Sequence, residues 1–505
     1  MLFNSPEFLF CYLPLVLLGY AVAARFGRTA VVFWLAAMSV AFYAYWRPAF
    51  VVLLLGSVFS NYLFALGIWR YRHQPRLQRT LVSIGVVANL AALAYFKYLF
   101  PLLHFIETTF GMVTGPNDII LPLGISFFTF TQIAYLIDLA DDEAAPQDLP
   151  GYILFVTFFP HLIAGPILHH REIMPQFAES RAFRLKLNDL ALGLSWFTLG
   201  LCKKVLIADQ FAPYADAAFS HPHELNMAGA WIGVLNYSMQ LYFDFSGYSD
   251  MAIGLARMFS IEFPFNFNSP YKSRNIIEFW SRWHMTLTRY LTMYIYNPVS
   301  LKINRIRAAQ GKPMSRKAQR TLNGFLALVA LPTMITMFLA GIWHGAGFQF
   351  VIFGVLHGTY LSVNHAWRIF RNENSIIARA LNWSPASIAL TFFAVMLGQI
   401  FFRSSSSKDA YDVITALLGM HHAAADDFHG LPHRAFLFLL ALPIVWCFPN
   451  VQEILGQSGQ TEQKHSWPAF LLWKPSLPWA AALGCALVAV LWYMTNTSSF
   501  LYFQF

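Results

Sequence analysis

Apolar runs of close to twenty residues recur along almost the whole length of this 505-residue chain. Hydrophobic residues make up 57% of it and charged residues only 12%, whereas about a quarter of a soluble domain is charged. A run of about twenty apolar residues spans a bilayer as a helix, because lipid leaves the backbone no other hydrogen-bond partners. The sequence therefore predicts an all-α polytopic membrane protein with about 11–12 transmembrane helices. The candidate spans are 8–24, 30–46, 49–68, 80–98, 119–138, 188–208, 227–256, 323–341, 347–367, 384–402, 434–448 and 476–494.

The placement of charge predicts how the chain threads the membrane. The net charge is +9, and two stretches, 70–79 and 302–320, are strongly basic. The stretch 209–226 has no Lys or Arg. Because cytoplasmic loops carry an excess of Lys and Arg, we expect 70–79 and 302–320 on the cytoplasmic side and 209–226 outside. Threading the spans from there puts the N-terminus outside.

Three apolar segments contain residues that interrupt a helix. Segment 151–170 includes Pro160 and the pair Gly165-Pro166, and segment 96–106 includes Lys97 and Pro101. Segment 275–297 is apolar on one side only. Broken helices at membrane depth are tolerated where they are buried in protein or line a cavity. The sequence therefore predicts an enclosed site lined by re-entrant or interfacial helices.

Two histidines lie in or beside such segments. His344 interrupts the apolar stretch AGIWHGAGFQF, and His284 lies in 275–297, where helical spacing places it on one face with Trp280 and Trp283. An ionisable group at membrane depth usually carries function. A neutral imidazole can take a proton from a hydroxyl that attacks an acyl carbonyl, and His284 can bind the donor carbonyl or the developing oxyanion. The alternative for each is an interhelical hydrogen bond.

Other polar residues in apolar stretches are weaker candidates for a catalytic or binding role. Asp244 and Asp250 can orient a histidine or line an entry, or form a polar clasp between helices. For His357 we expect a structural hydrogen bond. The histidines and aspartates of 421–433 lack a recognisable ligand spacing, and the four cysteines lack CxxC spacing. We therefore expect no metal site and no tightly bound cofactor.

Several motifs together resemble the membrane-bound O-acyltransferase (MBOAT) family, in particular the bacterial branch that includes the alginate O-acetylation membrane protein. The C-terminal FLYFQF is similar as well, and the likeness covers most of residues 1–400. The matching stretches are ILPLGISFFTFTQIAYLID (120–138), FFPHLIAGPILHHREIMPQF (158–177), LYFDFSGYSDMAIGLA (241–256), FNSPYKSRNIIEFWSRWHMTLTRYL (267–291) and GIWHGAGFQFVIFGVLHG (341–358).

The resemblance implies an acyl-transfer site in a funnel through the membrane. The near-invariant histidine of the family falls on His344, and its second position, Asn or His, falls on His284. The implied donor is acetyl-CoA or another cytoplasmic acyl thioester, whose phosphates suit basic side chains. The expected donor-binding residues are Lys272, Arg274, Arg282 and Arg289. The residues considered as funnel lining are Asp244, Asp250, Trp343 and His161.

The resemblance also implies the setting of the reaction. We expect a multi-pass protein of the bacterial inner membrane, with a periplasmic N-terminus, forming one integral-membrane domain over 1–505. Within it, 1–400 is the family-like core, and 401–505 holds an outer loop and the last two helices. The implied partners are an extracytoplasmic acyltransferase or other glycan-modifying protein, a polysaccharide synthase complex and membrane lipids, without nucleic acid.

One departure leaves the polymer open. After the segment ending at Leu291, the family pattern usually has a glycine-rich turn, whereas this chain has TMYIYNPVSLKIN and then a long basic stretch. Alginate-like polymers, acetylated cellulose and other exopolysaccharides all stay possible. Alternatives are transfer of an acyl or D-alanyl group to a carrier, peptide or lipid, a polytopic transporter, and a non-catalytic scaffold of a synthase complex. A transporter should show repeat symmetry, and none is visible.

Overall fold

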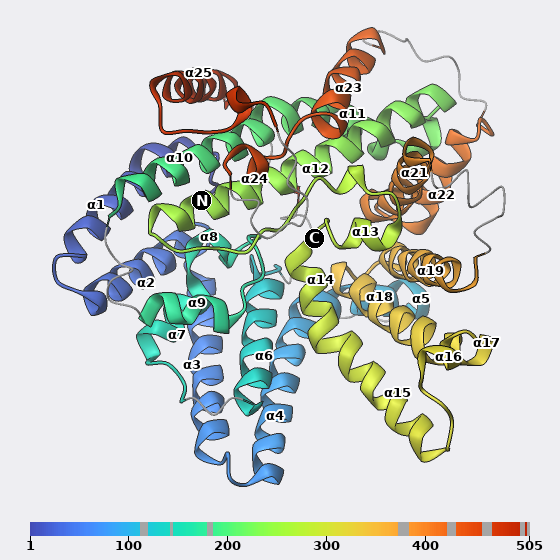
Figure 1. Cartoon of the computed structure of the whole chain (residues 1–505), viewed down its shortest axis with the longest axis horizontal. Helices are drawn as coiled ribbons and strands as arrows, with labels where there is room; N and C mark the ends of the chain where they lie inside the picture. Colours follow the sequence, from blue (N-terminus) through green and yellow to red (C-terminus); the bar gives the residue numbers. More distant parts are fainter. Residues whose placement is uncertain are drawn as a thin grey trace. The chain divides into compact units, whose positions relative to one another are not determined.

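The structure is a computed structural model of the full chain. It describes residues 1–111, 120–141, 145–178, 185–371, 383–421, 431–456, 467–494 and 500–501. In these residues all regular structure is helical (Figure 1), which confirms the predicted all-α class. The helices group into two compact units, each assembled from separate stretches of the chain.

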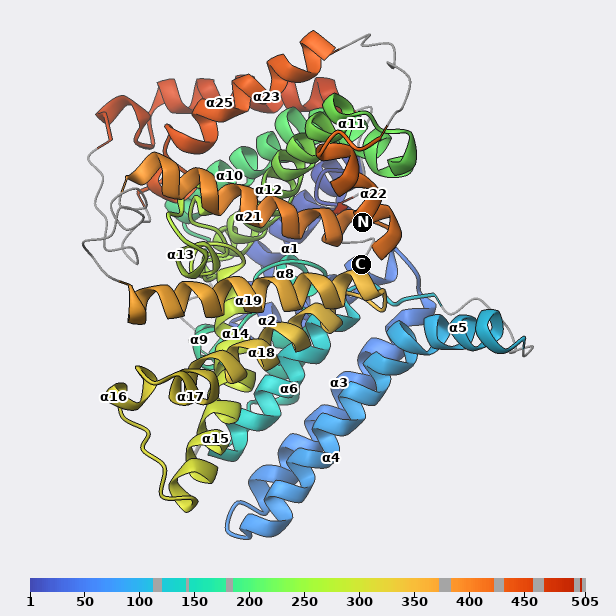
Figure 2. The same ribbon diagram turned by 90° about the vertical axis from the view of Figure 1, so that its right-hand side faces the viewer.

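The first unit comprises residues 1–206, 245–265 and 472–504. Helices α3 and α4 form its long hairpin, and α6 packs against both (Figure 2). Its elements are η1 (Glu7–Tyr12), α1 (Leu13–Ala23), α2 (Arg28–Ala44), α3 (Ala49–Arg70), α4 (Pro75–Ala94), η2 (Tyr95–Leu99), α5 (Phe100–Phe110), α6 (Ile125–Asp141), α7 (Leu149–Thr157), α8 (Phe159–Leu162), α9 (His170–Ala178), α10 (Leu187–Cys202), the start of η3 (Lys203–Ala208), the second part of α12 (Met227–Met258) and α25 (Leu477–Tyr493).

The second unit comprises residues 207–244 and 266–471. Both predicted catalytic histidines belong to it. Its elements are the end of η3, α11 (Asp209–Ser220), η4 (Pro222–Glu224), the first part of α12, η5 (Pro270–Lys272), α13 (Ile276–Trp280), α14 (Met285–Leu291), η6 (Thr292–Tyr296), α15 (Asn297–Ala309), α16 (Arg316–Gln319), α17 (Leu322–Phe325), η7 (Leu326–Ala330), α18 (Leu331–His344), α19 (Phe348–Phe370), α21 (Ser384–Arg403), α22 (Ser407–Leu417), α23 (Leu431–Trp446), α24 (Val451–Ile454) and η9 (Ala469–Leu471).

The described helices confirm the membrane character of the chain. Five continuous helical runs are long and apolar enough to cross a bilayer, and three shorter runs are also apolar. The long runs are Ala49–Arg70, Pro75–Phe110, Leu187–Ser220, Leu322–His344 and Ser384–Arg403. Every one of the twelve predicted spans overlaps a helix, while their number across the membrane stays a prediction.

One of the predicted helix breaks is wrong and another is confirmed. Segment 96–106 belongs to one continuous run from Pro75 to Phe110, because the wide π turn η2 comes just before Pro101 and leaves it in the first turn of α5, where a proline is tolerated. Most of 209–226 is the helix α11, and its position outside the membrane stays a prediction. The break in 151–170 is confirmed, since α7 ends at Thr157 and the short α8 is followed by non-helical residues up to His169.

Glycines allow close helix contacts in both units. Gly341 of α18 and Gly354 of α19 face each other so closely that a Cβ on Gly341 would lie 2.4 Å from the Phe350 carbonyl oxygen. These helices run side by side (Figure 2). In the first unit a Cβ on Gly247 would lie 2.7 Å from the Gly200 carbonyl oxygen. Gly247 therefore lets α12 approach α10 closely, and α12 continues through it as one helix.

Candidate active site

His344 is the last residue of α18, and its side chain is buried among aromatic rings. The Trp343 ring centroid lies 4.7 Å from that of His344, Phe402 of α21 lies 5.0 Å away and Phe353 of α19 lies 5.7 Å away. The Gly341–Gly354 contact brings α19 close enough for Phe353 to reach the imidazole. His344 therefore lies at a helix end with aromatic rings packed around its side chain.

His284 lies where the chain breaks between α13 and α14. The prediction that helical spacing places His284 on one face with Trp280 and Trp283 is wrong, because α13 ends at Trp280 and His284 is the N-cap of α14, in the left-handed region at φ 44°. Trp283 and His284 therefore do not share a continuous helical face with Trp280. A non-glycine residue in this region costs about 1–3 kcal/mol and persists only where its surroundings hold it.

The hydrogen bonds of Asn266 fix the protonation of His284. The Asn266 side-chain oxygen accepts a bond from the Thr286 backbone N–H at 3.4 Å and from the Thr286 hydroxyl at 2.9 Å, and it lies 2.9 Å from His284 Nδ1. Because the backbone N–H can only donate, the atom facing it is the Asn266 oxygen. His284 Nδ1 therefore carries the proton, and Nε2 is the acceptor nitrogen of the neutral ring.

Burial keeps His284 in this neutral state. The side chain is 1% exposed, and burial lowers its pKa to about 3; its segment lies outside the apolar helices that are long enough to span a bilayer. A neutral ring with an Nδ1 proton cannot donate a hydrogen bond from Nε2. This geometry disfavours the predicted role of His284 in binding a carbonyl oxygen or oxyanion, and favours a role as a hydrogen-bond acceptor.

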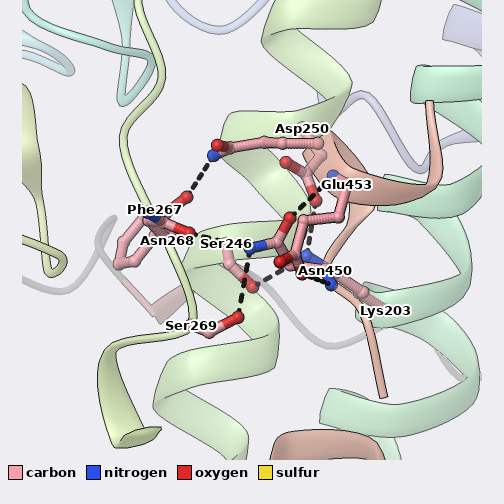
Figure 3. A network of polar contacts seen from close by, with 9 residues as sticks. Lys203, Ser246, Asp250, Phe267, Asn268, Ser269, Asn450 and Glu453 are labelled. Carbon is pink, nitrogen blue, oxygen red and sulfur yellow. Dashed lines mark hydrogen bonds and ion pairs between the residues drawn. The ribbon is translucent and has the colours of Figure 1, made fainter. Parts of the chain in front are cut away.

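The strained loop that ends at His284 is anchored at several points. Asn268 N–H donates to the Arg282 carbonyl at 2.9 Å, and Met285 N–H donates to the Asn266 carbonyl at 2.9 Å. Asn450, which caps α24, donates to Asn268 Oδ1 at 2.9 Å and to Ser269 Oγ at 3.1 Å (Figure 3). Gln452 of α24 donates to the Phe267 carbonyl. The backbone around His284 is therefore held by α14 on one side and by α24 on the other.

His357 has the structural role expected for it. The Trp280 indole N–H donates to His357 Nδ1 at 3.3 Å, and the Phe353 ring lies 4.6 Å from the His357 ring. Phe353 also contacts His344, so a line of rings leads from His344 through Phe353 and His357 to Trp280. Helix α18 packs against η6, which continues the helical run that starts at His284. The two predicted catalytic histidines thus belong to one packed assembly in the second unit.

The four predicted lining residues are divided between the two units, and their role as funnel lining stays a prediction. Asp250 forms an ion pair with Lys203 at 2.5 Å in the first unit, which is the polar clasp considered as its alternative role (Figure 3). His161, also in the first unit, bonds the Phe155 carbonyl through Nε2 at 2.9 Å. Asp244 is buried in α12. The Trp343 ring packs against the His344 ring.

The predicted donor-binding residues fall into different settings. Arg282 pairs with Glu278 at 2.9 Å, and Lys272 donates to the Phe448 carbonyl at 2.7 Å. Arg289 is half-buried in α14. Arg274 lines a cavity of about 770 Å³ between α13, α19 and α21. The same cavity is lined by Arg368, Arg371, Tyr360 and Trp367, with Val363, Leu390 and Ala394 as its apolar part.

A buried histidine at an apolar helix end and a second, tautomer-fixed histidine suit acyl transfer, and comparison with known proteins decides the family. Residues 16–310 match the MBOAT, membrane-bound O-acyltransferase family. The chain belongs to the membrane-bound O-acyltransferase family. This membership, predicted from the motifs, is confirmed, and the chain is an O-acyltransferase.

Named relatives of the family resemble the chain over most of its length. A peptidoglycan O-acetyltransferase of Helicobacter pylori is 38% identical, covering 83% of this chain and 80% of its own. A probable alginate O-acetylase AlgI of Azotobacter vinelandii is 39% identical, covering 83% and 78%. A teichoic acid D-alanyltransferase of Streptococcus thermophilus is 26% identical, covering 57% and 70%. The matched family region includes His284 and ends before His344.

Several residues of the site escaped the sequence reasoning. Asn266, which sets the His284 tautomer, lies in the stretch before α13 and α14. Nothing in its sequence context distinguishes it from the other amide residues nearby. Arg368 and Arg371 join Arg274 at the cavity although they lie at the end of α19, far along the chain. Phe353 and Phe402 looked like ordinary apolar helix residues.

Proposed function

We propose that this O-acyltransferase takes an acyl group, acetyl in the first instance, from a cytoplasmic thioester and passes it across the bacterial inner membrane for O-acylation of a glycan. The carrying observation is the pair of buried histidines in one unit, each at the break or end of a helix. The two relatives of higher identity are named as O-acetyltransferases, one of peptidoglycan and one probably of alginate.

His344 is the proposed general base. Its neutral imidazole takes the proton of an acceptor hydroxyl while that oxygen bonds to the thioester carbonyl carbon. The tetrahedral intermediate then breaks its carbon–sulfur bond, and the imidazolium returns the proton to the leaving thiolate. The aromatic rings of Phe353, Phe402 and Trp343 exclude water around His344, which protects the thioester from hydrolysis.

His284 is the proposed orienting group. Its Nε2 is the acceptor nitrogen because Nδ1 donates to Asn266, so it suits a hydroxyl or amide N–H of a bound substrate. A thioester donor of the CoA type offers amide N–H groups along its arm. A rigid acceptor, held by the loop bonds of Asn266, fixes the reacting carbonyl relative to His344 and so contributes through orientation.

The cavity of Arg274, Arg368 and Arg371 is the proposed donor entry. Arginines bind phosphate through charge-assisted, often bidentate hydrogen bonds, while Val363, Leu390 and Ala394 offer an apolar wall to the rest of the donor. By the positive-inside rule, the basic stretch 302–320 lies in the cytoplasm. The run from α17 to α18 starts from that side, and α19 returns toward it. We therefore expect the C-terminal end of α19 in the cytoplasm. Of the four predicted donor ligands, Arg274 is the strongest candidate because it lines this cavity. The other three bond to other protein groups or are half-buried, namely Lys272, Arg282 and Arg289.

The acceptor side of the proposal is a glycan outside the inner membrane. An exopolysaccharide or peptidoglycan hydroxyl can receive the acyl group from this protein directly, or through an extracytoplasmic acyltransferase working with a synthase complex. The N-terminus then lies in the periplasm, as the charge pattern predicts.

Sealed membrane vesicles of both orientations test this function. Inverted vesicles, with the cytoplasmic face outward, are given isotope-labelled acetyl-CoA, and labelled acetyl ester on enclosed glycan is measured by mass spectrometry. We expect labelling in inverted vesicles that contain the protein, and none in right-side-out vesicles or in vesicles lacking it. Labelling of right-side-out vesicles by external donor contradicts the proposed direction. Labelling by a D-alanyl thioester and not by acetyl-CoA favours the D-alanyl alternative.

A further inference from the structure

A cluster of two histidines and one carboxylate lies in the first unit, apart from the residues proposed for acyl transfer. Asp138 is near the end of α6, His169 precedes α9, and His170 is the first residue of α9. One side-chain nitrogen or oxygen from each lies within 4.8 Å of the others. Asp138 and His170 are buried, and the His169 side chain is only 12% exposed.

The arrangement converges on one oxygen. Asp138 Oδ2 lies 2.8 Å from His169 Nε2 and 3.4 Å from His170 Nδ1. Four ligands placed tetrahedrally at about 2.0–2.1 Å from a zinc ion lie roughly 3.3 Å from one another. The His170 separation matches this value, and the His169 pair needs to open by only about half an ångström to admit an ion.

An aromatic ring packs directly against the cluster, and two further rings pack against that ring. The Tyr135 ring, one turn before Asp138 on α6, packs edge-on against His170 with centroids 5.3 Å apart. Tyr152 of α7 lies 5.0 Å from Tyr135, and Phe155 lies 6.2 Å from it. An aromatic shell around a small polar centre limits solvent access and holds ligand orientation. The carbonyl end of α6 adds a partial negative charge that favours a cation.

We propose that Asp138, His169 and His170 bind a zinc ion. Two imidazole nitrogens favour a transition metal over Mg²⁺ or Ca²⁺, which prefer oxygen ligands. Zinc takes two histidines and a carboxylate, with water in the fourth position. The ion ties the end of α6 to the start of α9 and bridges two elements that are distant in sequence. The fourth position stays open to water, and the zinc content of the site does not depend on the proposed acyl donor or acceptor.

Metal analysis of the purified full-length protein tests this site. The protein is prepared in detergent with a tag that contains no histidine, passed through metal-free buffer, and its zinc is measured by mass spectrometry. We expect about one zinc per chain in the wild type, and under about a tenth of that in Asp138→Asn and in His169→Ala. His104→Ala, which removes an exposed histidine of α5 in the same unit, is the matched control and should keep the wild-type zinc content.

If a variant fails to fold, the melting temperature of the wild-type protein with and without zinc still tests the proposal. Zinc added to chelator-treated wild type should raise its melting temperature, because an ion that binds only the folded state stabilises it. The proposal is overturned if wild-type protein holds under about a tenth of a zinc per chain and gains no thermal stability from added zinc. It is also overturned if folded Asp138→Asn retains the wild-type zinc content; in either case the three residues form a hydrogen-bonded cluster only.

Discussion

His344 and His284 are both buried, but different groups surround them. His344 ends a regular helix and is enclosed by Trp343, Phe353 and Phe402. His284 lies on strained left-handed backbone, and its Nδ1 is paired with Asn266 inside a network of polar contacts. The first environment lowers the polarity around a proton acceptor, and the second fixes the position and tautomer of a ring.

This difference suggests a division of labour. A group that gains and loses a proton benefits from an apolar enclosure that admits the reacting hydroxyl and excludes water. A group that orients a substrate benefits from rigid support, because small displacements of the reacting atoms cost much rate. We therefore expect His344 to dominate the rate and His284 to act through geometry, and the following substitutions test that order.

The largest expected effect follows His344→Ala. Loss of a positioned base lowers a rate by about a hundred- to ten-thousand-fold, while the aromatic neighbours and the α18–α19 contact stay in place. We expect normal membrane levels and almost no acyl ester on the exported glycan, measured by mass spectrometry of the glycan and immunoblotting of the membranes. Normal acylation by a variant present at normal levels contradicts the role of His344.

A smaller loss should follow His284→Ala. Removing an orienting acceptor should lower transfer by roughly ten- to a hundredfold. Asn266→Leu is the informative companion, because it conserves approximate volume while removing the acceptor that fixes the His284 tautomer. If the tautomer matters, Asn266→Leu should reproduce much of the His284→Ala loss in protein that is correctly folded. Full activity of folded Asn266→Leu contradicts the proposed support.

The donor cavity should affect binding more than turnover. Arg274→Gln combined with Arg368→Gln removes two cations from the cavity and should raise KM for the acyl thioester by about tenfold, with kcat changed less. The matched control is Arg70→Gln with Arg72→Gln, at the basic turn after α3. Equal changes in both double variants count against a donor site between α13, α19 and α21.

The smallest effect on chemistry is expected for His357→Ala. This substitution leaves the buried Trp280 N–H without its partner and opens a cavity, which together cost on the order of 2–4 kcal/mol of stability. Membrane levels should fall, but transfer per molecule should stay within about threefold of the wild type. A loss per molecule as large as that of His344→Ala would reassign the catalytic base to His357.

The membrane fold was largely predictable because each bilayer span requires its own apolar run. Runs such as 49–68 and 384–402 match α3 and α21 closely. The errors arose where backbone geometry overrode composition. Pro101 was expected to break a helix, yet the π turn η2 accommodates it.

The site was predictable in its residue types and less so in its geometry. His344 and His284 stood out because imidazoles are rare in apolar segments. Helical spacing in 275–297 gave the wrong face, because the left-handed backbone at His284 depends on Asn266, Asn450 and Gln452, which lie outside that segment. Arg368 was likewise missed because the cavity is formed only when α13, α19 and α21 pack together.

The most direct test of the central claim, that His344 and His284 serve one acyl-transfer site, is the rate of the double variant His284→Ala/His344→Ala beside both single variants. The rate of labelled acetyl transfer is measured in inverted vesicles at equal protein levels. Residues that act as a unit are strongly non-additive. We predict that the double variant is no slower than His344→Ala, because orientation gains nothing once the base is absent. A double variant slower than His344→Ala by the whole factor lost in His284→Ala would contradict the claim, since independent sites multiply their losses.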